Sequence, residues 1–447
     1  MKLWIGLVFL VGCAGPRPWE IPWAAQPVRP PGSESGRYPV DLATVLQLAG
    51  ANNLDVALVR EKVHEAYAVE RLADEKFWPS VGLAAVFRRH AGLTQGTDGT
   101  FVDVDKQQLF AGGRATLRWE PGEAIFAKLA ASQRFDSSLR QLEAVELSIA
   151  LEAAIAYYDL LRETLRARVA QESVLISEKL AAQLETSVGL GRSFKGDFLR
   201  ARVQLASNRL GVARARESAR LASIRLTSIL RIAPDIELVP SESEPVALSL
   251  VPPEITLEQA LQEAMKQRPE IQEAQAELAA SRHEKNAATW GALIPEIYAE
   301  AAPGELGPNS GNLRDTVDYL IMVGWRIGPG GLFDPGRQQL TDARFIKAEI
   351  ALERTRQKVA EQVYSAWNQL QSRLEQMKIV EQAVKDAEEA LDLNIQRQST
   401  GVGLPLEVIQ AEEALTRIRI DSLAGVIDYN QAQLRLFAYR GARLQIR

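Results

Sequence analysis

The apolar positions of this chain follow helical spacing in some stretches and strand spacing in others, and the order of these stretches occurs twice. Helical patterns begin near residues 41 and 256, each behind a side chain, Asp41 or Thr256, that can cap a first turn. Prolines at 79 and 295 end the patterns, which predicts helices over 41–77 and 256–292. We therefore expect one structural unit, repeated at an interval of roughly 210 residues.

Two segments of alternating apolar and polar residues follow each of these helices, as in strands with one apolar face. The apolar residues of the first unit are Val81, Leu83, Ala85 and Phe87, then Ala115, Leu117 and Trp119. Those of the second unit are Ile297, Ala299 and Ala301, then Tyr319, Ile321, Val323, Trp325 and Ile327. Polar, glycine-containing loops are predicted near 91–112 and 303–316, between the strands of each pair.

Two very long helices are predicted next, because residues 123–188 and 337–400 contain neither glycine nor proline. At about 1.5 Å per residue, each would be roughly 100 Å long, several times the thickness of a small domain. Glycine-containing turns follow at 188–191 and 400–403, and return helices are predicted near 197–232 and 406–440. The two shorter helices of a unit, placed end to end, would line the long one.

The N-terminus has the features of a bacterial lipoprotein signal. Lys2 precedes an apolar run from Leu3 to Val11 that is too short to span a bilayer. The sequence from Leu10 to Cys13 looks like a lipobox, where a cysteine is lipidated and the chain is cleaved just before it. Cys13 is the only cysteine, so an internal disulfide is excluded, and a buried free thiol is the alternative. We expect Cys13 to carry the lipid that anchors the chain in the outer membrane.

These patterns divide the chain along its length. The predicted parts are a signal peptide (1–12), a lipidated proline-rich tether (13–40), a first repeat (41–240), a linker (241–254), a second repeat (255–441) and a tail (442–447).

The charge pattern limits the kinds of molecule that the protein can bind. The net charge of −5 comes from 52 basic and 57 acidic residues that are mixed along the chain, which argues against nucleic acid. Beyond the N-terminus there is no apolar run of about 18 residues, so a membrane crossing would use strands or an anchor. Two pairs of strands have open edges that cannot lie in lipid, whereas three copies of four strands could close a barrel. Trp78, Trp119, Tyr319 and Trp325 would suit its interfaces, although ordinary packing also explains them.

The order of helix, strand pair, long helix, glycine turn and return helix, present twice, resembles the TolC-like outer-membrane efflux protein family. The segment Gly331-Leu332-Phe333-Asp334-Pro335-Gly336-Arg337 and the two glycine turns are the most similar parts. The resemblance implies a mainly α fold with a small β part, in which duplicated helical hairpins form a periplasmic α-barrel and four strands per chain complete a roughly 12-stranded trimeric outer-membrane β-barrel. It implies a homotrimer that exports solutes from an inner-membrane pump through a periplasmic adaptor protein.

The resemblance also assigns roles to the turns and to the residues after them. The turns would contact the adaptor through Gly189, Leu190, Gly191, Gly401, Val402 and Gly403. Glu407 and Gln410 lie where the family pattern has two acids that ring the tunnel entrance, and Asp197 follows Gly191 as Glu407 follows Gly401. The alternative is that Asp197 and Glu407 only favour the first turns of their helices.

Other functions have little support in the sequence. Residues 189–196 contain glycines and a lysine but lack the order of a phosphate-binding loop. His64, His90 and His283 are scattered, so neither a metal site nor a cofactor is expected, and we find no catalytic arrangement. Two alternative functions fit part of the pattern. One is type I protein secretion through the same duct. The other is that of a periplasmic adaptor or a structural coiled-coil lipoprotein.

Overall fold

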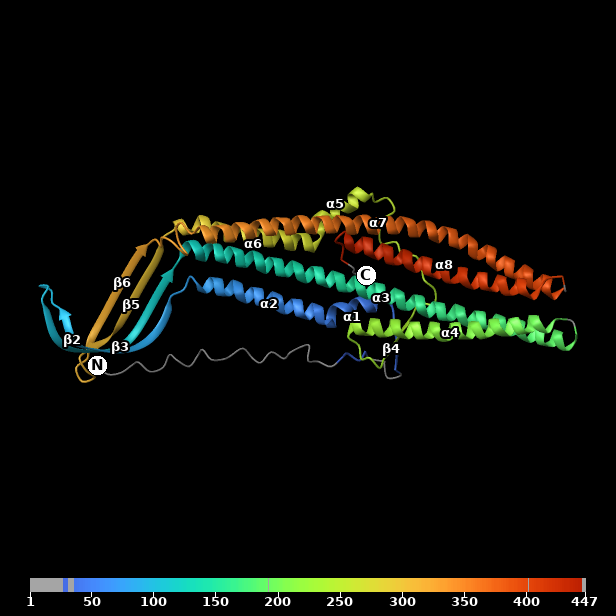
Figure 1. Cartoon of the computed structure of the whole chain (residues 1–447), viewed down its shortest axis with the longest axis horizontal. Coiled ribbons are helices and arrows are strands. Elements are labelled where there is room, and N and C mark those ends of the chain that lie inside the picture. The colour runs from blue at the N-terminus through green and yellow to red at the C-terminus, as the bar shows by residue number, and fades with distance from the viewer. Residues whose placement is uncertain (1–26, 31–35, 192, 401, 444–447) are drawn as a thin grey trace.

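The computed structural model describes residues 27–30, 36–191, 193–400 and 402–443. Cys13, the predicted signal peptide and Gly401 lie outside the described residues. The strands of one sheet lie at one end of an elongated molecule, and long helices run from them to the other end (Figure 1). The same order of elements occurs twice along the chain.

The helices of the first unit are α1 (Leu42–Asn52), α2 (Leu54–Glu75), α3 (Pro121–Gly189) and α4 (Lys195–Leu230). Those of the second are α5 (Leu257–Gln267), α6 (Pro269–Thr289), α7 (Pro335–Ser399) and α8 (Pro405–Tyr439), with a short 3-10 helix at Gly291–Leu293. The two long helices are confirmed, since α3 contains 69 residues and α7 contains 65. The return helices are confirmed as well.

The prediction of one continuous helix before each strand pair is wrong. Asn53 separates α1 from α2, because its extended backbone ends α1 and its side chain accepts hydrogen bonds from the amides of Asp55 and Val56. In the second unit Arg268 separates α5 from α6, because it is extended ahead of Pro269. Both units are therefore broken at equivalent places.

Four antiparallel strands form the main sheet in the order β2-β3-β5-β6. They are β2 (Ser80–Gln95), β3 (Phe101–Trp119), β5 (Glu296–Gly307) and β6 (Arg314–Gly324). The predicted loops are too long, since pairing continues to Gln95 opposite Phe101 and to Leu306 opposite Arg314. Strands pair through backbone hydrogen bonds, which do not depend on side-chain polarity. The paired strands therefore extend beyond the point where apolar and polar side chains stop alternating.

A second sheet was not predicted. The strands β1 (Arg37–Val40) and β4 (Glu237–Pro240) pair in parallel, with Tyr38 opposite Leu238. Each strand has four residues, which is too short for a recognisable alternation. This sheet joins the end of the predicted tether to the segment that follows α4.

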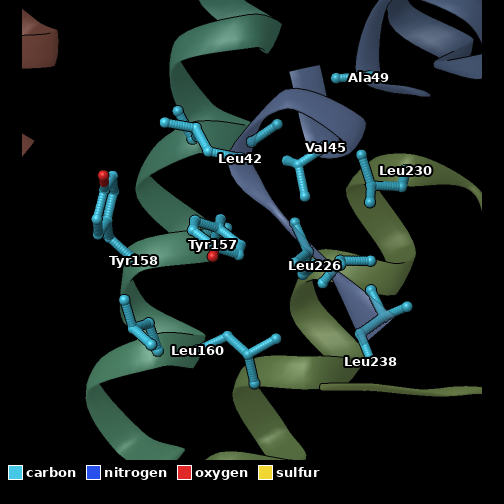
Figure 2. Close-up of a cluster of buried hydrophobic side chains, with 14 of the residues drawn as sticks. Leu42, Val45, Ala49, Tyr157, Tyr158, Leu160, Leu226, Leu230 and Leu238 are labelled. Atoms are coloured by element: carbon cyan, nitrogen blue, oxygen red, sulfur yellow. The ribbon is translucent and has the colours of Figure 1, made fainter. Parts of the chain in front are cut away.

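The largest apolar core lies where α1, α3, α4 and β4 meet. Figure 2 shows Leu42 and Val45 of α1, Tyr157 and Leu160 of α3, and Leu226 of α4 in this cluster. A second core joins α5, α6, α7 and α8, and a third joins the two hairpins near their turns. The helices are thus held together in three places along their length.

The linker between the units is fixed to α8 by side chains rather than by a sheet. Asn430 accepts a hydrogen bond from the amide of Leu248 at 2.8 Å and donates one to the carbonyl of Val246 at 2.8 Å. Gln433 accepts from the amide of Val251 at 2.9 Å. These buried amides satisfy backbone groups that would otherwise lack partners.

Within the described ranges, no single helix has both the length and the apolar composition of a membrane span. One pair of helices, α1 with α2, meets these criteria together and is bent by 41°.

Candidate functional site

One face of the main sheet is apolar and exposed. Paired residues on neighbouring strands lie on the same face, and Ala115 is opposite Ala301, which is opposite Tyr319. Tyr319 is 78% exposed. The apolar face consists of Val81, Leu83, Ala85, Phe87, Leu109, Ala111, Ala115, Leu117, Trp119, Ile297, Ala299, Ala301, Val317, Tyr319, Ile321 and Val323. A contiguous apolar surface of this size needs a cover other than water.

The opposite face of the same strands is polar near the helices. Arg114 forms an ion pair with Glu300 at 3.2 Å, and the hydroxyl of Tyr298 donates to Glu300 at 2.5 Å. The hydroxyls of Ser80 and Thr116 are 2.7 Å apart. Near the helices this face is therefore more polar than the other, although Leu320 and Met322 also lie on it.

The apolar face ends before the strands do. On β5 and β6 it ends first, because Glu305, opposite Ala111, and Asp315, opposite Glu305, lie on this face. Arg89, two residues after Phe87 on the same face, forms two hydrogen bonds with Asp105 at 3.0 and 2.8 Å. From Trp119 to Leu109 the apolar part of β3 covers about 34 Å along the strand, at about 3.4 Å per residue. The rest of the β2–β3 hairpin continues past β5, whose last partner on β3 is Leu109.

Three of the four aromatic residues singled out in the sequence are exposed, namely Trp78, Tyr319 and Trp325. The indole of Trp325 also donates to the carbonyl of Leu293 at 3.0 Å. Trp119 instead packs against Phe77, with ring centroids 6.4 Å apart. Trp119 is therefore partly covered by the chain itself.

Charged side chains connect the sheet to the long helices. Arg326 forms ion pairs with Glu120 at 3.1 Å and with Glu296 at 2.8 Å, which joins both units. Asp334 caps α7, because its carboxylate accepts from the amides of Arg337 at 3.0 Å and Gly330 at 2.8 Å. These hydrogen bonds lower the pKa of Asp334 below its ordinary value.

The turn between α3 and α4 presents apolar side chains to solvent. Gly189 is the last residue of α3, and a Cβ there would meet nothing within 4 Å. Gly191 has a φ of +69°, which favours glycine. Leu190 is exposed, and Phe194 is 84% exposed. The turn thus offers an apolar surface that contains small residues.

The turn between α7 and α8 lies at the same end of the molecule (Figure 1). Val402 and Leu404 are exposed. The amide of Gly403 donates to the carbonyl of Arg397 at 2.9 Å, and a Cβ on Gly403 would lie 2.9 Å from the amide of Gln398. Gly403 therefore has a structural role that Gly189 does not have.

The acids near these turns have partners within their own hairpins. Glu407 accepts from the amide of Leu404 at 3.3 Å and lies 3.6 Å from the guanidinium of Arg397. Asp197 lies 3.5 Å from Arg200, and Gln410 is exposed. Both acids occupy the first turn of a helix, which is compatible with the helix-end alternative, and their place in a tunnel ring stays a prediction.

A buried acid on α8 was missed in the sequence. Glu412 lies between Ile409 and Leu415, at the three-residue spacing of an apolar helix face, and this spacing is the signal that could have revealed it. In the part of the chain that the structure describes, no group of three or more histidine, cysteine, aspartate or glutamate residues could hold a metal ion.

Comparisons with known proteins agree with this arrangement. Residues 260–442 match the family model described as outer membrane efflux protein. No curated protein matches the chain. A membrane protein from Pseudomonas aeruginosa is 20% identical with a TM-score of 0.79, over 95% of this chain and 97% of that one.

Two further solved structures are similar over most of their length. The CmeC outer membrane channel of Campylobacter jejuni has a TM-score of 0.78 at 14% identity, over 90% of this chain and 85% of that one. The MtrE outer membrane channel of Neisseria gonorrhoeae, in its open state, has a TM-score of 0.74 at 17% identity, over 90% and 89%.

The chain therefore has the fold of these outer-membrane channels. Within this fold, residues 260–442 carry the match to the outer membrane efflux protein family.

Proposed function

We propose that three copies of this chain form a channel that exports solutes from an inner-membrane pump, through a periplasmic adaptor, across the periplasm and the outer membrane. The observation that carries the proposal is the sheet with one exposed apolar face, one polar face and two outer strands, at the end of a long helical body. The same duct could serve type I protein secretion, and isolation of the pump that is bound to the channel would distinguish the two cargoes.

Closure of the sheet supports a trimer. Among the described residues β2 and β6 are the outer strands, and each pairs with one strand. Pairing β6 of one copy with β2 of the next removes both edges and gives a barrel of about 12 strands. With a strand tilt of about 45°, the 34 Å apolar part of β3 corresponds to a height of roughly 24 Å, close to the apolar band of outer-membrane barrels.

The internal repeat supports a specific arrangement of the helices at the contact between neighbouring copies. Within the chain α3 packs against α6 and against the 3-10 helix that follows it, where the aromatic ring of Phe126 lies 3.4 Å from a Cβ built on Gly291. Aligned on Pro121 and Pro335, Phe126 corresponds to Leu340 of α7, which is 51% exposed. We infer that α7 packs against α2 of the next copy as α3 packs against α6, and that this contact covers Leu340.

The turns are proposed as the adaptor contact, through Gly189, Leu190, Gly191, Gly401, Val402 and Gly403. The exposed apolar side chains of Leu190, Phe194 and Val402 support this assignment, since an apolar patch at a helix end favours a protein partner. Asp197, Glu407 and Gln410 are proposed to ring the tunnel just inside the turns. Lipid on Cys13 is proposed as an additional anchor, and mass spectrometry of membrane-extracted protein tests it.

The membrane assignment is tested by a charge on each face of β6. Ile321 lies on the apolar face and is opposite Ala299, whereas Leu320 lies on the other face and is opposite Glu300. Ile321→Arg should cost about 2–4 kcal/mol per copy in the middle of the bilayer and should reduce the trimer in outer-membrane fractions. Leu320→Arg is the matched control and should assemble, because its charge lies beside Glu300. Equal assembly of both variants would contradict the proposed membrane face.

A further inference from the structure

Glu412 on α8 is a carboxylate buried between the two hairpins of one chain, and it is 3% exposed. One of its oxygens accepts hydrogen bonds from the hydroxyl of Ser173 on α3 and from the side-chain amide of Asn208 on α4, the latter at 3.1 Å. The other oxygen accepts from the hydroxyl of Ser177 on α3 at 3.4 Å. A buried carboxylate with several donors is a strong directional contact.

The donors are themselves connected. The side-chain nitrogen of Asn208, which shares its two hydrogens among these acceptors, also lies 3.0 Å from the hydroxyl of Ser173 and 2.7 Å from that of Ser177. The side-chain carbonyl of Asn208 accepts from Gln204 at 3.2 Å, and the hydroxyl of Thr416 on α8 is 3.2 Å from that of Ser173. Among the described residues, no lysine, arginine or histidine forms an ion pair with Glu412. The cluster therefore joins α3, α4 and α8 through one charged acceptor and neutral donors.

The cluster lies close to the turns. Glu412 follows Pro405, the first residue of α8, by about two helical turns, or roughly 10 Å. The third apolar core surrounds it, with Leu184 of α3 and Val408 and Leu415 of α8. Near the turns, the two hairpins of a chain are held together by this core, by the Glu412 cluster and by the ion pair between Arg419 of α8 and Glu172 of α3 at 3.6 Å.

The equivalent positions of the other repeat lack these groups. Aligned on Gly191 and Gly401, Glu412 corresponds to Arg202, and the positions of Ser173, Ser177 and Asn208 are occupied by Ala383, Ala387 and Ile418. In a closed ring of repeats, the contact of α8 with α3 inside a chain corresponds to the contact of α4 with α7 of a neighbouring copy. The contact between copies therefore has no carboxylate cluster at this level.

We propose that the Glu412 cluster is a latch that holds the two hairpins of a chain together near the turns, so that the tunnel opens by separation between copies rather than within one copy. This inference rests on the proposed trimeric channel. In a ring of three copies, the contacts between hairpins of one chain would carry the Glu412 cluster, and the contacts between copies would lack it. The two kinds of contact would alternate around the ring, with three of each. The hairpin pair of one chain would then move as one body.

The test compares Glu412→Ala with Glu413→Ala in the full-length protein, because Glu413 is the exposed neighbour on the same helix. Hydrogen–deuterium exchange of residues 405–416 should be about 10-fold faster in Glu412→Ala and unchanged in Glu413→Ala. Residues 427–436, whose apolar side chains lie in the larger cores, should keep their protection in both variants. Ser177→Ala, which removes one donor, should accelerate exchange at 405–416 to a smaller extent and provides the test if Glu412→Ala does not fold.

Channel conductance in planar bilayers provides the second measurement. Glu412→Ala should increase the basal conductance several-fold, because the hairpins of a chain then separate as well. Unchanged exchange and conductance in Glu412→Ala and in Ser177→Ala would overturn the latch, while a conducting wild type would leave the proposed function intact. A wild type that neither conducts nor exports would overturn the proposed function, and exchange at 405–416 would still decide whether the cluster holds the hairpins.

Discussion

The backbones of Gly122 and Gly291 touch where α3 begins and the second unit approaches its strands. A Cβ on Gly122 would lie 2.0 Å from the carbonyl oxygen of Gly291, and one on Gly291 would lie 2.9 Å from that of Gly122. Both contacts are with backbone atoms, so a side-chain movement cannot relieve them. This contact fixes the distance between the two units at the base of the sheet.

Gly122→Ala should therefore destabilise the chain by about 1–3 kcal/mol or more, because backbone must move to make room. The measurement is the free energy of unfolding from thermal or denaturant melts of detergent-solubilised protein. Gly211→Ala is the control, since a Cβ there meets nothing within 4 Å and alanine favours a helix interior. A Gly122→Ala variant as stable as Gly211→Ala would show that the two backbones are not in contact.

A second prediction concerns the proposed contact between copies. Leu340→Glu should weaken the trimer while leaving the fold of each chain intact, because Leu340 is exposed in the single chain and the proposed contact covers it. Native mass spectrometry and circular dichroism measure the two effects separately. Glu349→Gln, an exposed change further along α7, serves as the control. Trimers of normal stability with Leu340→Glu would place the interface elsewhere.

Much of the architecture could be predicted because it follows from patterns that a single chain displays. The absence of glycine and proline defined the long helices, and alternation defined the apolar parts of the strands. The breaks at Asn53 and Arg268 were missed, although Pro269 directly follows Arg268, because each lies inside an uninterrupted apolar pattern. The hairpin beyond Phe87 was missed because its residues are polar and pair through backbone groups.

The candidate site was less accessible to sequence reasoning. Glu407 and Asp197 could be identified from their positions after the turns, but their ion pairs with Arg397 and Arg200 depend on side-chain geometry. Glu412 lies on the apolar face of α8, and its donors come from residues more than 200 positions away in the chain. Such a cluster is visible only after α3, α4 and α8 are placed together.

A third prediction separates the roles of the two turns. Gly189→Trp should leave the fold and the trimer intact but reduce export in cells that contain the pump and the adaptor, because a side chain there meets nothing in the chain but would obstruct a partner. Gly403→Trp should instead disturb the turn itself, since its Cβ would collide with the backbone of Gln398. Normal export with Gly189→Trp would remove this turn from the adaptor contact.

A fourth prediction tests the proposed constriction. Glu407→Ala should weaken the cation preference of the channel in planar bilayers and its block by multivalent cations, because it removes a carboxylate from each copy and leaves Arg397 without that partner. Asp197→Ala should add to the effect. Arg397→Ala is the control and should preserve or increase the cation preference. A double acid variant with unchanged selectivity would leave both acids as helix-end groups only.

The last prediction concerns the pH dependence of the proposed latch. Burial raises the pKa of Glu412 above its ordinary value of 4.5, although the hydrogen bonds from Ser173, Ser177 and Asn208 oppose the shift, and the negative charge of Glu413 adds to it. The other charged groups that flank the cluster are paired in Arg209–Glu178, Arg419–Glu172 and Arg419–Glu388. Glu412 is therefore the group in this region whose protonation depends most directly on whether the hairpins are joined or separated.

The direction of the pH effect follows from a comparison of the two states of the latch, in which the hairpins are joined or separated. When the hairpins separate, Glu412 becomes solvated and its pKa returns toward 4.5, so a proton binds more tightly in the joined state. Protonation then stabilises the joined state, fully below 4.5 and progressively less as the pH rises through the raised pKa of the joined state.

Acidification should lower the conductance of the wild-type channel, and alkaline pH should not. Glu412→Gln, which keeps the shape but cannot ionise, should lack this response, whereas Glu413→Gln should retain it. An identical pH profile in the wild type and in Glu412→Gln would exclude Glu412 as the titrating group.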